Sequence, residues 1–392
     1  MNSSPPGKIK EFLHIIALEN EPSSFRGGQE LSLLNVCQGL YKRGHTISLL
    51  YLKEGNLLEQ YQEFCKEVFK IDGYMLDRKR MLKIFKFWGD ISKIPVEENS
   101  IVYSNRYHDL FFGYMLSFCK KASLVCHLRL PPPKTFGRPH TIGLKGTKQF
   151  ITTSMQTKLD WIESGIKEEK IDVVHNAIDP KIFKPSINFE QTRKEWNIQK
   201  SIKVISYVGR LDQEKGLETL IRAFALLVRN CPNVRLLIAG KPLSTQEKYG
   251  KLLQDLSCSL GIEKQVDFLG HITNTTSLYQ VSDVTVLPSL WSEPFGKAII
   301  ESMACSTPVV ASRTGGIPEI LTGEFQNWLF EPGNEQDLLD KLTGIINWRE
   351  TAPQLGERCR EHVLDKFCPE KMVDSIEKVL LRVANSVGLS AN

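Results

Sequence analysis

The sequence lacks the features that would mark a membrane-spanning or disulfide-stabilised protein. Across 392 residues there is no run of roughly 18 uncharged apolar residues, the length that a membrane-spanning helix needs. The nine cysteines form no C-x-x-C pair and no zinc-like grouping, which favours reduced thiols in a cytosolic compartment. The amino terminus has no long apolar segment of the signal-peptide kind. We therefore expect a cytoplasmic enzyme, at most associated peripherally with the inner face of a membrane.

Two further absences narrow the chemistry. No G-x-G-x-x-G follows a predicted strand, which argues against a dehydrogenase. No D-x-D lies at the end of a predicted strand, so no carboxylate cluster is available for a divalent metal. A net charge of +5 is also too small for a nucleic-acid-binding protein of this length. We expect no metal, no other cofactor and no nucleic-acid partner.

What the sequence does contain is a repeated alternation of apolar strand-like runs with helical segments. The predicted strands are 12–18, 45–51, 101–104, 122–127, 149–154, 204–209, 234–239, 266–269, 284–289 and 308–311. Such alternation predicts an α/β protein with parallel sheets covered by helices on both faces. The length suits two domains of ~200 residues each, and the charged, proline-broken stretch 180–202 is the expected link.

The stretch 291–321, WSEPFGKAIIESMACSTPVVASRTGGIPEIL, holds the strongest functional pattern. Glu293 and Glu301 lie eight residues apart, on the loop and the helix that follow a predicted strand. Pro294 and Gly296 shape the loop, and the helix is expected to begin near Lys297. Because the first amides of a helix are unpaired, the backbone at 295–298 is a natural site for a phosphate or a polarised oxygen.

Its motifs SEPFGxxxxE, TPVVAS and TGGIPE resemble the signature of retaining, GT-B-fold glycosyltransferases of family 4. In that family the acid matching Glu293 contacts hydroxyls of the donor sugar, and the acid matching Glu301 holds the ribose of the nucleotide. The residues Pro294, Phe295 and Gly296 would then also contact the donor. The alternative is a pair of solvated acids on an ordinary helix.

The resemblance implies a GT-B fold, with two doubly wound, Rossmann-like domains that face a central cleft. Residues 1–185 would form the acceptor-side domain, and residues 186–367 the domain that binds the nucleotide-sugar. The terminal helix, 368–392, would cross back to the first domain.

Two basic residues follow the predicted strand 204–209, in the sequence GRLDQEKG. Arg210 offers a planar guanidinium fork and Lys215 a compact ammonium, and both can stabilise the charge of a leaving diphosphate. Their spacing matches the glycine-arginine-leucine and lysine-glycine motif of the family. A solvated basic pair near a helix start is the alternative.

The first domain carries four further candidates. Gly27 and Gly28 close the loop after the first strand; they either lie beside the donor diphosphate, as in the family, or make a tight turn before a helix. His127 matches the family's active-site histidine, which hydrogen-bonds the donor sugar, although a lone histidine is more often structural. Arg129 either shares that role or serves the acceptor.

Asn176 lies in the segment VVHNAID, which matches a family motif near the donor site, with Ala177 in place of a glycine. Its alternative role is to make the turn out of a strand.

A basic segment at 77–91 is predicted to form an amphipathic helix. Its apolar stripe consists of Met81, Ile84, Phe85, Trp88 and Ile91, and its basic side chains are Arg80, Lys83 and Lys86. Such helices can lie on anionic membranes. The alternative is a surface helix whose aromatic stripe packs on its own domain.

The resemblance to this family implies retaining, metal-independent transfer of a sugar from a nucleotide-diphosphate-sugar to an acceptor hydroxyl. A uridine diphosphate donor is favoured by its frequency in the family, and glycan, polysaccharide and glycolipid synthesis are the expected settings. A nucleotide-sugar epimerase of the same architecture and a non-catalytic sugar-nucleotide-binding module are the two alternatives.

Overall fold

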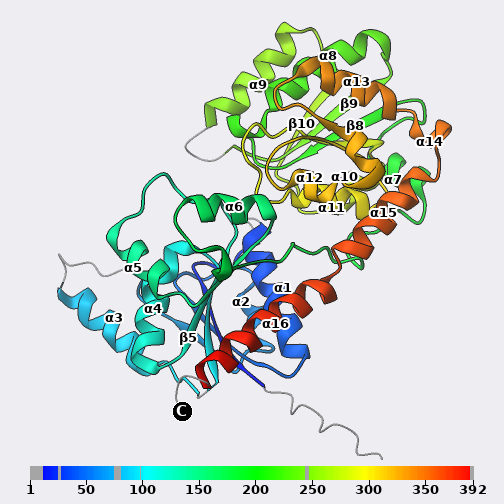
Figure 1. The fold of residues 1–392 in the computed structure, drawn as a ribbon. Helices are drawn as coiled ribbons and strands as arrows, with labels where there is room; N and C mark the ends of the chain where they lie inside the picture. Colours follow the sequence, from blue (N-terminus) through cyan, green and yellow to red (C-terminus); the bar gives the residue numbers. More distant parts are fainter. Residues whose placement is uncertain (1–11, 25–27, 75–80, 98, 243–246, 389–392) are drawn as a thin grey trace, which may run out of the picture. The chain divides into compact units, whose positions relative to one another are not determined.

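The computed structural model describes residues 12–24, 28–74, 81–97, 99–242 and 247–388 (Figure 1). Its contacts divide the chain into two compact units. The first comprises Met1–Thr153, Thr157–Val174 and Pro369–Asn392, and the second comprises Ser154–Gln156 and His175–Cys368. The contacts thus change unit after Val174, whereas the predicted ranges change at residue 185. Each unit is built around one parallel sheet, so the predicted two-domain α/β architecture is confirmed.

The first unit holds a seven-stranded sheet in the order β3-β2-β1-β4-β5-β6-β7. The strands are β1 (His14–Glu19), β2 (Thr46–Tyr51), β3 (Glu67–Lys70), β4 (Ser100–Ser104), β5 (Ser123–Leu128), β6 (Gln149–Thr152) and β7 (Ile171–Val173). The chain winds outward from β1 to β3 and then returns to β4 on the other side of β1. A ligand of such a sheet binds beyond the carboxyl ends of the strands, near this reversal.

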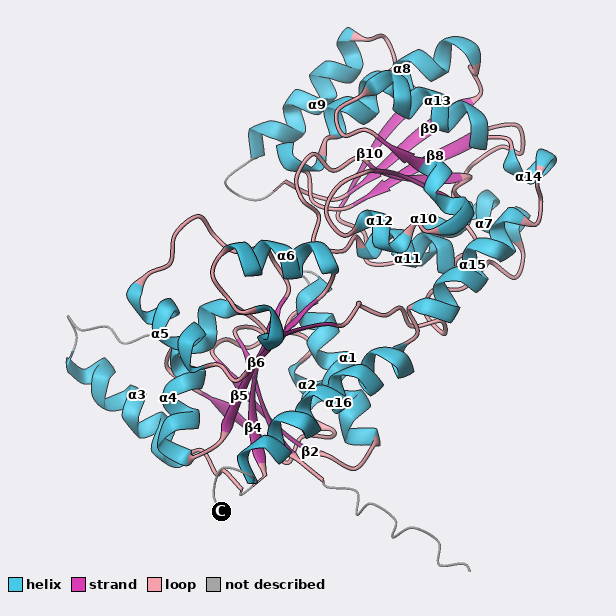
Figure 2. Cartoon of the chain, in the orientation of Figure 1, coloured by secondary structure: helices cyan, strands magenta, loops and turns pink. Residues whose placement is uncertain are grey.

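Helices cover both faces of this sheet. Figure 2 shows α3, α4 and α5 on one face and α1, α2 and α16 on the other. The helices and short 3-10 turns are α1 (Gly28–Lys42), α2 (Leu58–Gln62), α3 (Met81–Lys93), η1 (Tyr107–Asp109), α4 (Leu110–Lys120), α5 (Arg138–Gly146), α6 (Met155–Glu163), η2 (Glu168–Lys170) and α16 (Pro369–Gly388).

The last helix, α16, packs against α1. The carboxylate of Glu377 bonds Arg43 at 2.6 Å and the buried ring of His45 at 2.9 Å. Val373 lies against Gly39, where an added Cβ would come within 2.4 Å of it. The carboxyl-terminal helix is therefore an integral layer of the first unit.

The predicted basic helix lies at α3, but its buried face differs from the predicted stripe. Phe87 and Ile91 are buried, whereas Phe85 is 72% and Trp88 40% exposed. The buried positions are Phe87 and Ile91, one helical turn apart, and Ile94 just after the helix; of these, only Ile91 belongs to the predicted stripe. The prediction that Phe85 and Trp88 pack on their own domain is therefore wrong. Residues 77–80 and the side chains of 81–83 lie outside the described part.

The second unit holds a six-stranded sheet in the order β10-β9-β8-β11-β12-β13. Its strands are β8 (Lys203–Val208), β9 (Val234–Ala239), β10 (Val266–Gly270), β11 (Val284–Leu287), β12 (Val309–Ser312) and β13 (Leu329–Phe330). Figure 2 shows α8, α9 and α13 over one face and α10 and α11 over the other. The central strand β11 is buried at every position, as a strand covered on both faces requires.

The remaining helical elements of this unit are α7 (Phe189–Glu195), η3 (Gln213–Lys215), α8 (Leu217–Asn230), α9 (Glu247–Ser259), α10 (Thr275–Val281), α11 (Lys297–Ala304), α12 (Ile317–Ile320), η5 (Gly323–Trp328), α13 (Glu335–Ile345), α14 (Trp348–Thr351) and α15 (Leu355–Lys366). None of the helices in the described ranges is long and apolar enough to span a bilayer.

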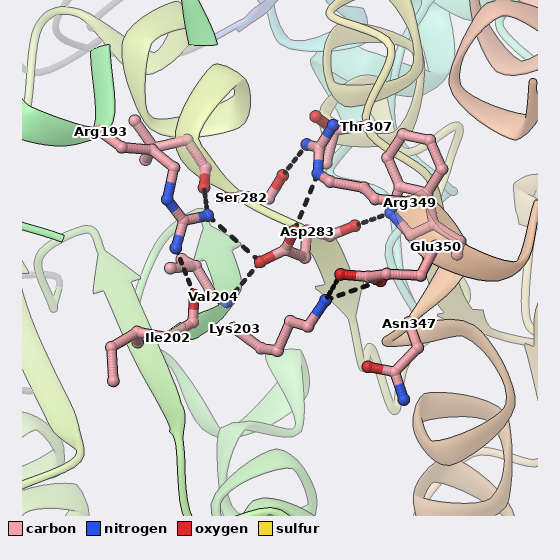
Figure 3. A network of polar contacts seen from close by, with 12 residues as sticks. Arg193, Ile202, Lys203, Val204, Ser282, Asp283, Thr307, Asn347, Arg349 and Glu350 are labelled. Carbon is pink, nitrogen blue, oxygen red and sulfur yellow. Dashed lines mark hydrogen bonds and ion pairs between the residues drawn. The ribbon is translucent and has the colours of Figure 1, made fainter. Parts of the chain in front are cut away.

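A buried carboxylate joins several of these elements at the amino end of β11 (Figure 3). Asp283 is 2% exposed. Its Oδ2 accepts hydrogen bonds from the Val204 amide at 2.8 Å and from Arg193 at 3.4 Å. Its Oδ1 accepts one from Arg349 at 2.9 Å. Two guanidinium groups thus neutralise and bind both oxygens of one buried acid.

Candidate active site

The loop between β11 and α11 presents the first predicted glutamate. Pro294, Phe295 and Gly296 are all buried, and the Phe295 ring packs against the ring of His175 at 5.7 Å between centroids. Gly296, directly before α11, has a φ of 97°, in the left-handed region that favours glycine. The side chain of Phe295 therefore anchors the loop in the core, and its backbone leads into the start of the predicted helix.

One oxygen of Glu293 receives three hydrogen bonds. Its Oε2 accepts from Lys215 Nζ at 2.5 Å, from Ser289 Oγ at 2.9 Å and from Trp291 Nε1 at 3.1 Å. Its Oε1 accepts no hydrogen bond from any residue in the described ranges. The carboxylate is thus fixed at one oxygen, while the other can accept a hydrogen bond from a ligand.

The two predicted basic residues have different surroundings. The Lys215 side chain is 11% exposed, pairs with Glu293, and lies 5.1 Å from the centre of the Trp291 ring. The Arg210 side chain is 50% exposed and lies 3.5 Å from Asp212. Lys215 is therefore already held in place, whereas Arg210 is free to reorient toward an anion.

Close backbone contacts hold the loops after β8 and β11 together. The amide of Leu290 donates to the carbonyl of Glu214 at 2.8 Å. Gly216 has a φ of 68°, and an added Cβ there would come within 2.0 Å of the Pro288 carbonyl oxygen. Lys215 and the glutamate loop are brought together by this packing.

The second glutamate, Glu301, lies on α11 and is oriented by a buried phenol. Tyr279 on α10 is fully buried and its hydroxyl donates to Glu301 Oε2 at 3.0 Å. Burial, and next the nearby Glu301 carboxylate, raise the pKa of Tyr279 well above its ordinary value. The phenol therefore keeps its proton and stays a hydrogen-bond donor.

The glycine loop after β12 lies directly on the backbone of Glu293. The amide of Gly316 donates to the Glu293 carbonyl at 2.7 Å. Gly315 has a φ of 57°, and an added Cβ would come within 2.1 Å of the same carbonyl oxygen. Both glycines are needed for this approach, so two successive βα turns form one surface around Glu293.

The last acid of the TGGIPE motif, Glu319, binds three groups that come early in the second unit's chain. It accepts from the amides of Met155 and Gln156 at 2.9 and 3.0 Å and contacts His175 Nε2 at 2.9 Å. Burial would raise the pKa of Glu319, but these hydrogen bonds outweigh it and lower the pKa. Asn176, which the family motif predicts to lie near the donor site, follows His175 and is 8% exposed.

In the first unit, the predicted histidine is buried next to a tyrosine. His127 lies on β5 and is 1% exposed, and its Nδ1 is 2.7 Å from the hydroxyl of Tyr103 on β4. Its Nε2 is buried and has no hydrogen-bond partner among the described residues. Burial, with a smaller contribution from Arg129, lowers the pKa of His127 well below its ordinary value. The imidazole is therefore neutral.

Arg129, the predicted acceptor or sugar contact, is itself 5% exposed. Its guanidinium donates to Asn105 Oδ1 at 2.5 Å and to Ser32 Oγ at 2.8 Å. These bonds join the ends of β4 and β5 to α1, so Arg129 has a structural role in this unit. Gly28 is the exposed first residue of α1, and Gly27 lies outside the described residues.

Four side chains at these sites were not predicted. Ser289 ends the predicted strand 284–289 and Trp291 begins the stretch 291–321, both just before Glu293, so polar groups close to a candidate acid in sequence are a usable signal. Tyr279 and Tyr103 are far from their partners in sequence, and only the packing of neighbouring elements brings them into contact. Among the described residues, no group of three or more His, Cys, Asp or Glu side chains is placed to hold a metal ion.

Two family models match the chain, one for each unit. The model "Glycosyl transferases group 1" matches residues 188–362, and the model "Glycosyltransferase Family 4" matches residues 26–182. The chain belongs to glycosyltransferase family 4. It is an enzyme that transfers glycosyl groups, and its two parallel-sheet units are those of the GT-B fold.

Curated relatives carry glycosyltransferase names. An uncharacterized glycosyltransferase of Methanocaldococcus jannaschii is 26% identical over 377 residues, 88% of this chain and 92% of that protein. The N-acetyl-alpha-D-glucosaminyl L-malate synthase of Bacillus anthracis is 31% identical over 209 residues, 53% of each chain. The chain thus matches about half the length of this second relative.

Among solved structures, Anabaena HepE in complex with UDP-glucose has a TM-score of 0.79 to this chain. It is 22% identical, and the match covers 94% of this chain and 99% of HepE. At that identity the likeness supports the fold.

Proposed function

We propose that this glycosyltransferase moves a sugar from a nucleotide-diphosphate-sugar to an acceptor hydroxyl, with retention at the anomeric carbon and without a metal ion. The observation that carries the proposal is the state of Glu293, with one oxygen bound by three donors and the other available. A carboxylate oxygen fixed in this way suits the recognition of sugar hydroxyls, because its position costs little further entropy on binding.

The charge of a leaving diphosphate needs a partner, and the second unit offers three. The Lys215 ammonium has three N–H groups and donates one to Glu293, so two remain for phosphate oxygens. Arg210 is half exposed in the same loop, and the amino terminus of α11 adds the partial positive charge of a helix dipole. Together they supply the stabilisation that a divalent metal would otherwise give.

The proposed retention follows a front-face displacement, without a covalent intermediate. Three hydrogen bonds, one of them from the Lys215 ammonium, lower the nucleophilicity of the Glu293 carboxylate and so disfavour a covalent intermediate on it. In the proposed reaction the acceptor oxygen bonds to the anomeric carbon as the bond to the diphosphate oxygen breaks. The acceptor's proton passes to the departing phosphate oxygen.

The proposed nucleotide is uridine diphosphate. The HepE structure of similar fold contains UDP-glucose, which is consistent with such a donor. In this chain, Glu301 would bind the ribose hydroxyls through the oxygen that Tyr279 does not occupy.

A panel of nucleotide-sugars, incubated with the protein and followed by NMR, tests the proposal. The expected result is slow release of free sugar and UDP from a UDP-sugar. The released sugar should have the anomeric configuration of the donor at early times, and the rate of release should be undiminished in excess EDTA. A new nucleotide-sugar without release would favour the epimerase, and binding without conversion would favour a non-catalytic module. Initial inversion would contradict retention, and loss in EDTA that Mg²⁺ restores would contradict metal independence.

We further propose that α3 contacts an anionic membrane, which would bring the site to lipid-linked acceptors. Phe85 and Trp88 are exposed on this helix together with Lys86, whose side chain is 62% exposed. The doubly substituted Phe85→Ser, Trp88→Ser protein should float less with vesicles that contain phosphatidylserine. Phe118→Ser, at another exposed phenylalanine, is the control. Equal flotation of all three proteins would contradict membrane contact through α3.

A further inference from the structure

The proposed reaction gives no role to the buried contact between Tyr103 and His127. The two side chains come from neighbouring strands, β4 and β5, and both are buried. The phenol oxygen lies 2.7 Å from His127 Nδ1, and the two rings meet edge to face with centroids 6.2 Å apart. On the far side of the imidazole, Nε2 is buried and has no partner in the described part of the chain.

The contact determines where the imidazole carries its proton. Burial raises the pKa of Tyr103, so the phenol keeps its hydrogen. Among the described residues, that hydrogen has one acceptor, which is His127 Nδ1. Nδ1 must then be unprotonated, and because the ring is neutral the proton resides on Nε2. The opposite tautomer would leave the phenol hydrogen unbonded as well as the bare Nε2.

The resulting Nε2–H is a buried donor without an acceptor, an arrangement that opposes folding and that proteins rarely keep without a reason. It lies near the carboxyl end of β5, the edge at which a parallel sheet binds its ligand. A hydroxyl or ring oxygen of a bound sugar would supply the missing acceptor.

We propose that Tyr103 is a positioning residue that fixes His127 in the Nε2–H form. The hydrogen bond to the donor sugar that the family resemblance implies for His127 is then donated by Nε2–H. His127 does not act as a general base, since Nε2 already holds a proton and Nδ1 is occupied by the phenol. The sugar contact rests on the proposed function, whereas the proton position does not.

The proton position can be read in the full-length wild-type protein. With ¹⁵N-labelled histidine, a long-range ¹H–¹⁵N spectrum distinguishes the protonated from the bare nitrogen of each of the eight histidine rings. His127→Gln identifies the relevant signals by their loss. We expect a bare Nδ1 and a protonated Nε2. A proton on Nδ1, or on both nitrogens, would overturn the proposal without any measurement of activity.

Substitution of the phenol tests whether Tyr103 is the cause. In Tyr103→Phe, the two nitrogen signals of His127 should move toward each other as the tautomers mix, and kcat should fall roughly tenfold with little change in KM. The control is Tyr61→Phe, because Tyr61 is another fully buried tyrosine whose hydroxyl has no partner among the described residues. It should leave both the His127 signals and kcat unchanged. Unchanged His127 signals in Tyr103→Phe would overturn the positioning role.

The sugar contact is tested separately by replacing the ring with amides. The glutamine of His127→Gln can place an N–H near the position of Nε2, whereas the asparagine of His127→Asn places one near Nδ1. We expect His127→Gln to retain at least roughly tenfold more kcat than His127→Asn. Equal losses would overturn the sugar contact and leave the tautomer intact. If the wild-type protein processes no nucleotide-sugar, the proposed function fails, and the spectrum still decides the proton position.

Discussion

Two acids of the second unit, Asp283 and Glu293, lie near opposite ends of β11 and differ in how fully they are bonded. Asp283, at the amino end, accepts hydrogen bonds at both oxygens, and two guanidinium groups take part (Figure 3). Glu293, after the carboxyl end, accepts three hydrogen bonds at one oxygen and none from the described residues at the other. The fully bonded carboxylate of Asp283 stabilises the fold, whereas the second oxygen of Glu293 can accept a hydrogen bond from a ligand.

The surroundings reinforce this difference. At the amino end, Arg349 stacks on the rings of Phe189 and Trp348, with its guanidinium carbon 4.1 and 4.4 Å from their centres. Aromatic rings thus cover part of the Arg349 guanidinium, whose side chain is 27% exposed, while Asp283 itself is withdrawn from solvent. At the carboxyl end, Lys215 lies over Trp291, but the adjoining Arg210 is half exposed. One end of the strand is sealed and the other is open.

The largest expected effect on stability comes from removing Asp283, the acid at the sealed amino end of β11. Asp283→Ala leaves the buried Arg193 and the partly exposed Arg349 without their shared carboxylate, and we expect a loss of about 3–5 kcal/mol in the free energy of unfolding. Urea unfolding followed by tryptophan fluorescence measures it. The comparison variant is Glu293→Gln, which keeps the shape of the side chain beside Lys215 and should lose less stability than Asp283→Ala while abolishing most turnover. A similar stability for both variants would contradict the distinction.

The next effect concerns the cation of the open end. Lys215→Ala should lower kcat by about 100-fold to 1,000-fold, or about 3–4 kcal/mol, because it removes both the orientation of Glu293 and a charge that stabilises the leaving group. Arg210→Ala, in the same loop, should be milder and act more on donor affinity, since Arg210 is half exposed. Lys215→Arg should restore part of the rate at most. Steady-state kinetics of the three variants provide the measurement. Full turnover of Lys215→Ala at saturating donor would exclude the leaving-group role.

A third acid, Glu19, extends the comparison to the first unit, where no cationic side chain of the described residues bonds its carboxylate. Glu19 accepts the Asn20 amide at Oε1, and its buried Oε2 has no partner in the described part of the chain. Burial, followed by the nearby Glu30, raises its pKa from an ordinary value of 4.5 to about 7. The stabilisation associated with this carboxyl group is therefore fully present below pH 4.5 and is lost as the pH rises through about 7.

Glu19→Gln tests this acid, because an amide cannot ionise. Relative to wild type, the variant should gain about 2–3 kcal/mol of stability between pH 4.5 and pH 8. Thermal unfolding of both proteins across that pH range gives the difference, in which the other titrating groups cancel. A difference that is constant with pH would show that Glu19 is ionised in the folded protein.

The smallest effect isolates one hydrogen bond of the open end. Trp291→Phe keeps a ring near Lys215 and removes the N–H that donates to Glu293, so kcat should fall roughly tenfold, or about 1.4 kcal/mol. Trp291→Leu should lose more because the ring also disappears. If Trp291→Phe equals wild type, Lys215 and Ser289 are sufficient to hold the carboxylate.

Much of the fold followed from sequence patterns, because strands buried on both faces are continuous apolar runs. β9 was predicted with its observed bounds, and β8 and β11 to within one or two residues. The edge strand β3 was missed because its EVFK sequence is only half buried and resembles a loop. The prediction of the buried face of α3 was wrong because Phe85 and Phe87 are equally apolar. Only the packing of Phe87 against Phe112, at 5.3 Å between ring centres, decides between them.

The candidate site was predictable where its residues share one local motif. Glu293, Glu301 and the glycine loop were found together because a βα turn brings them within a few dozen residues. The contacts that orient the site residues were not predicted, because the Tyr279–Glu301 and Tyr103–His127 hydrogen bonds depend on how separate elements pack. Arg129 was chosen for its charge and its place beside His127. Its bonds to Asn105 and Ser32 are long-range and leave no trace in the local sequence.

The close approach of Gly315 to Glu293 limits how this enzyme can be altered, in nature or in the laboratory. Even a methyl group at Gly315 would push against the Glu293 backbone, so the two loops cannot vary independently. A library intended to change the accepted sugar should keep Gly315 and Gly316 fixed and place its diversity at side chains that do not support the acid. Loop exchange with a relative should transfer the Glu293 loop and the Gly315 loop together, because each loop packs against the backbone of the other.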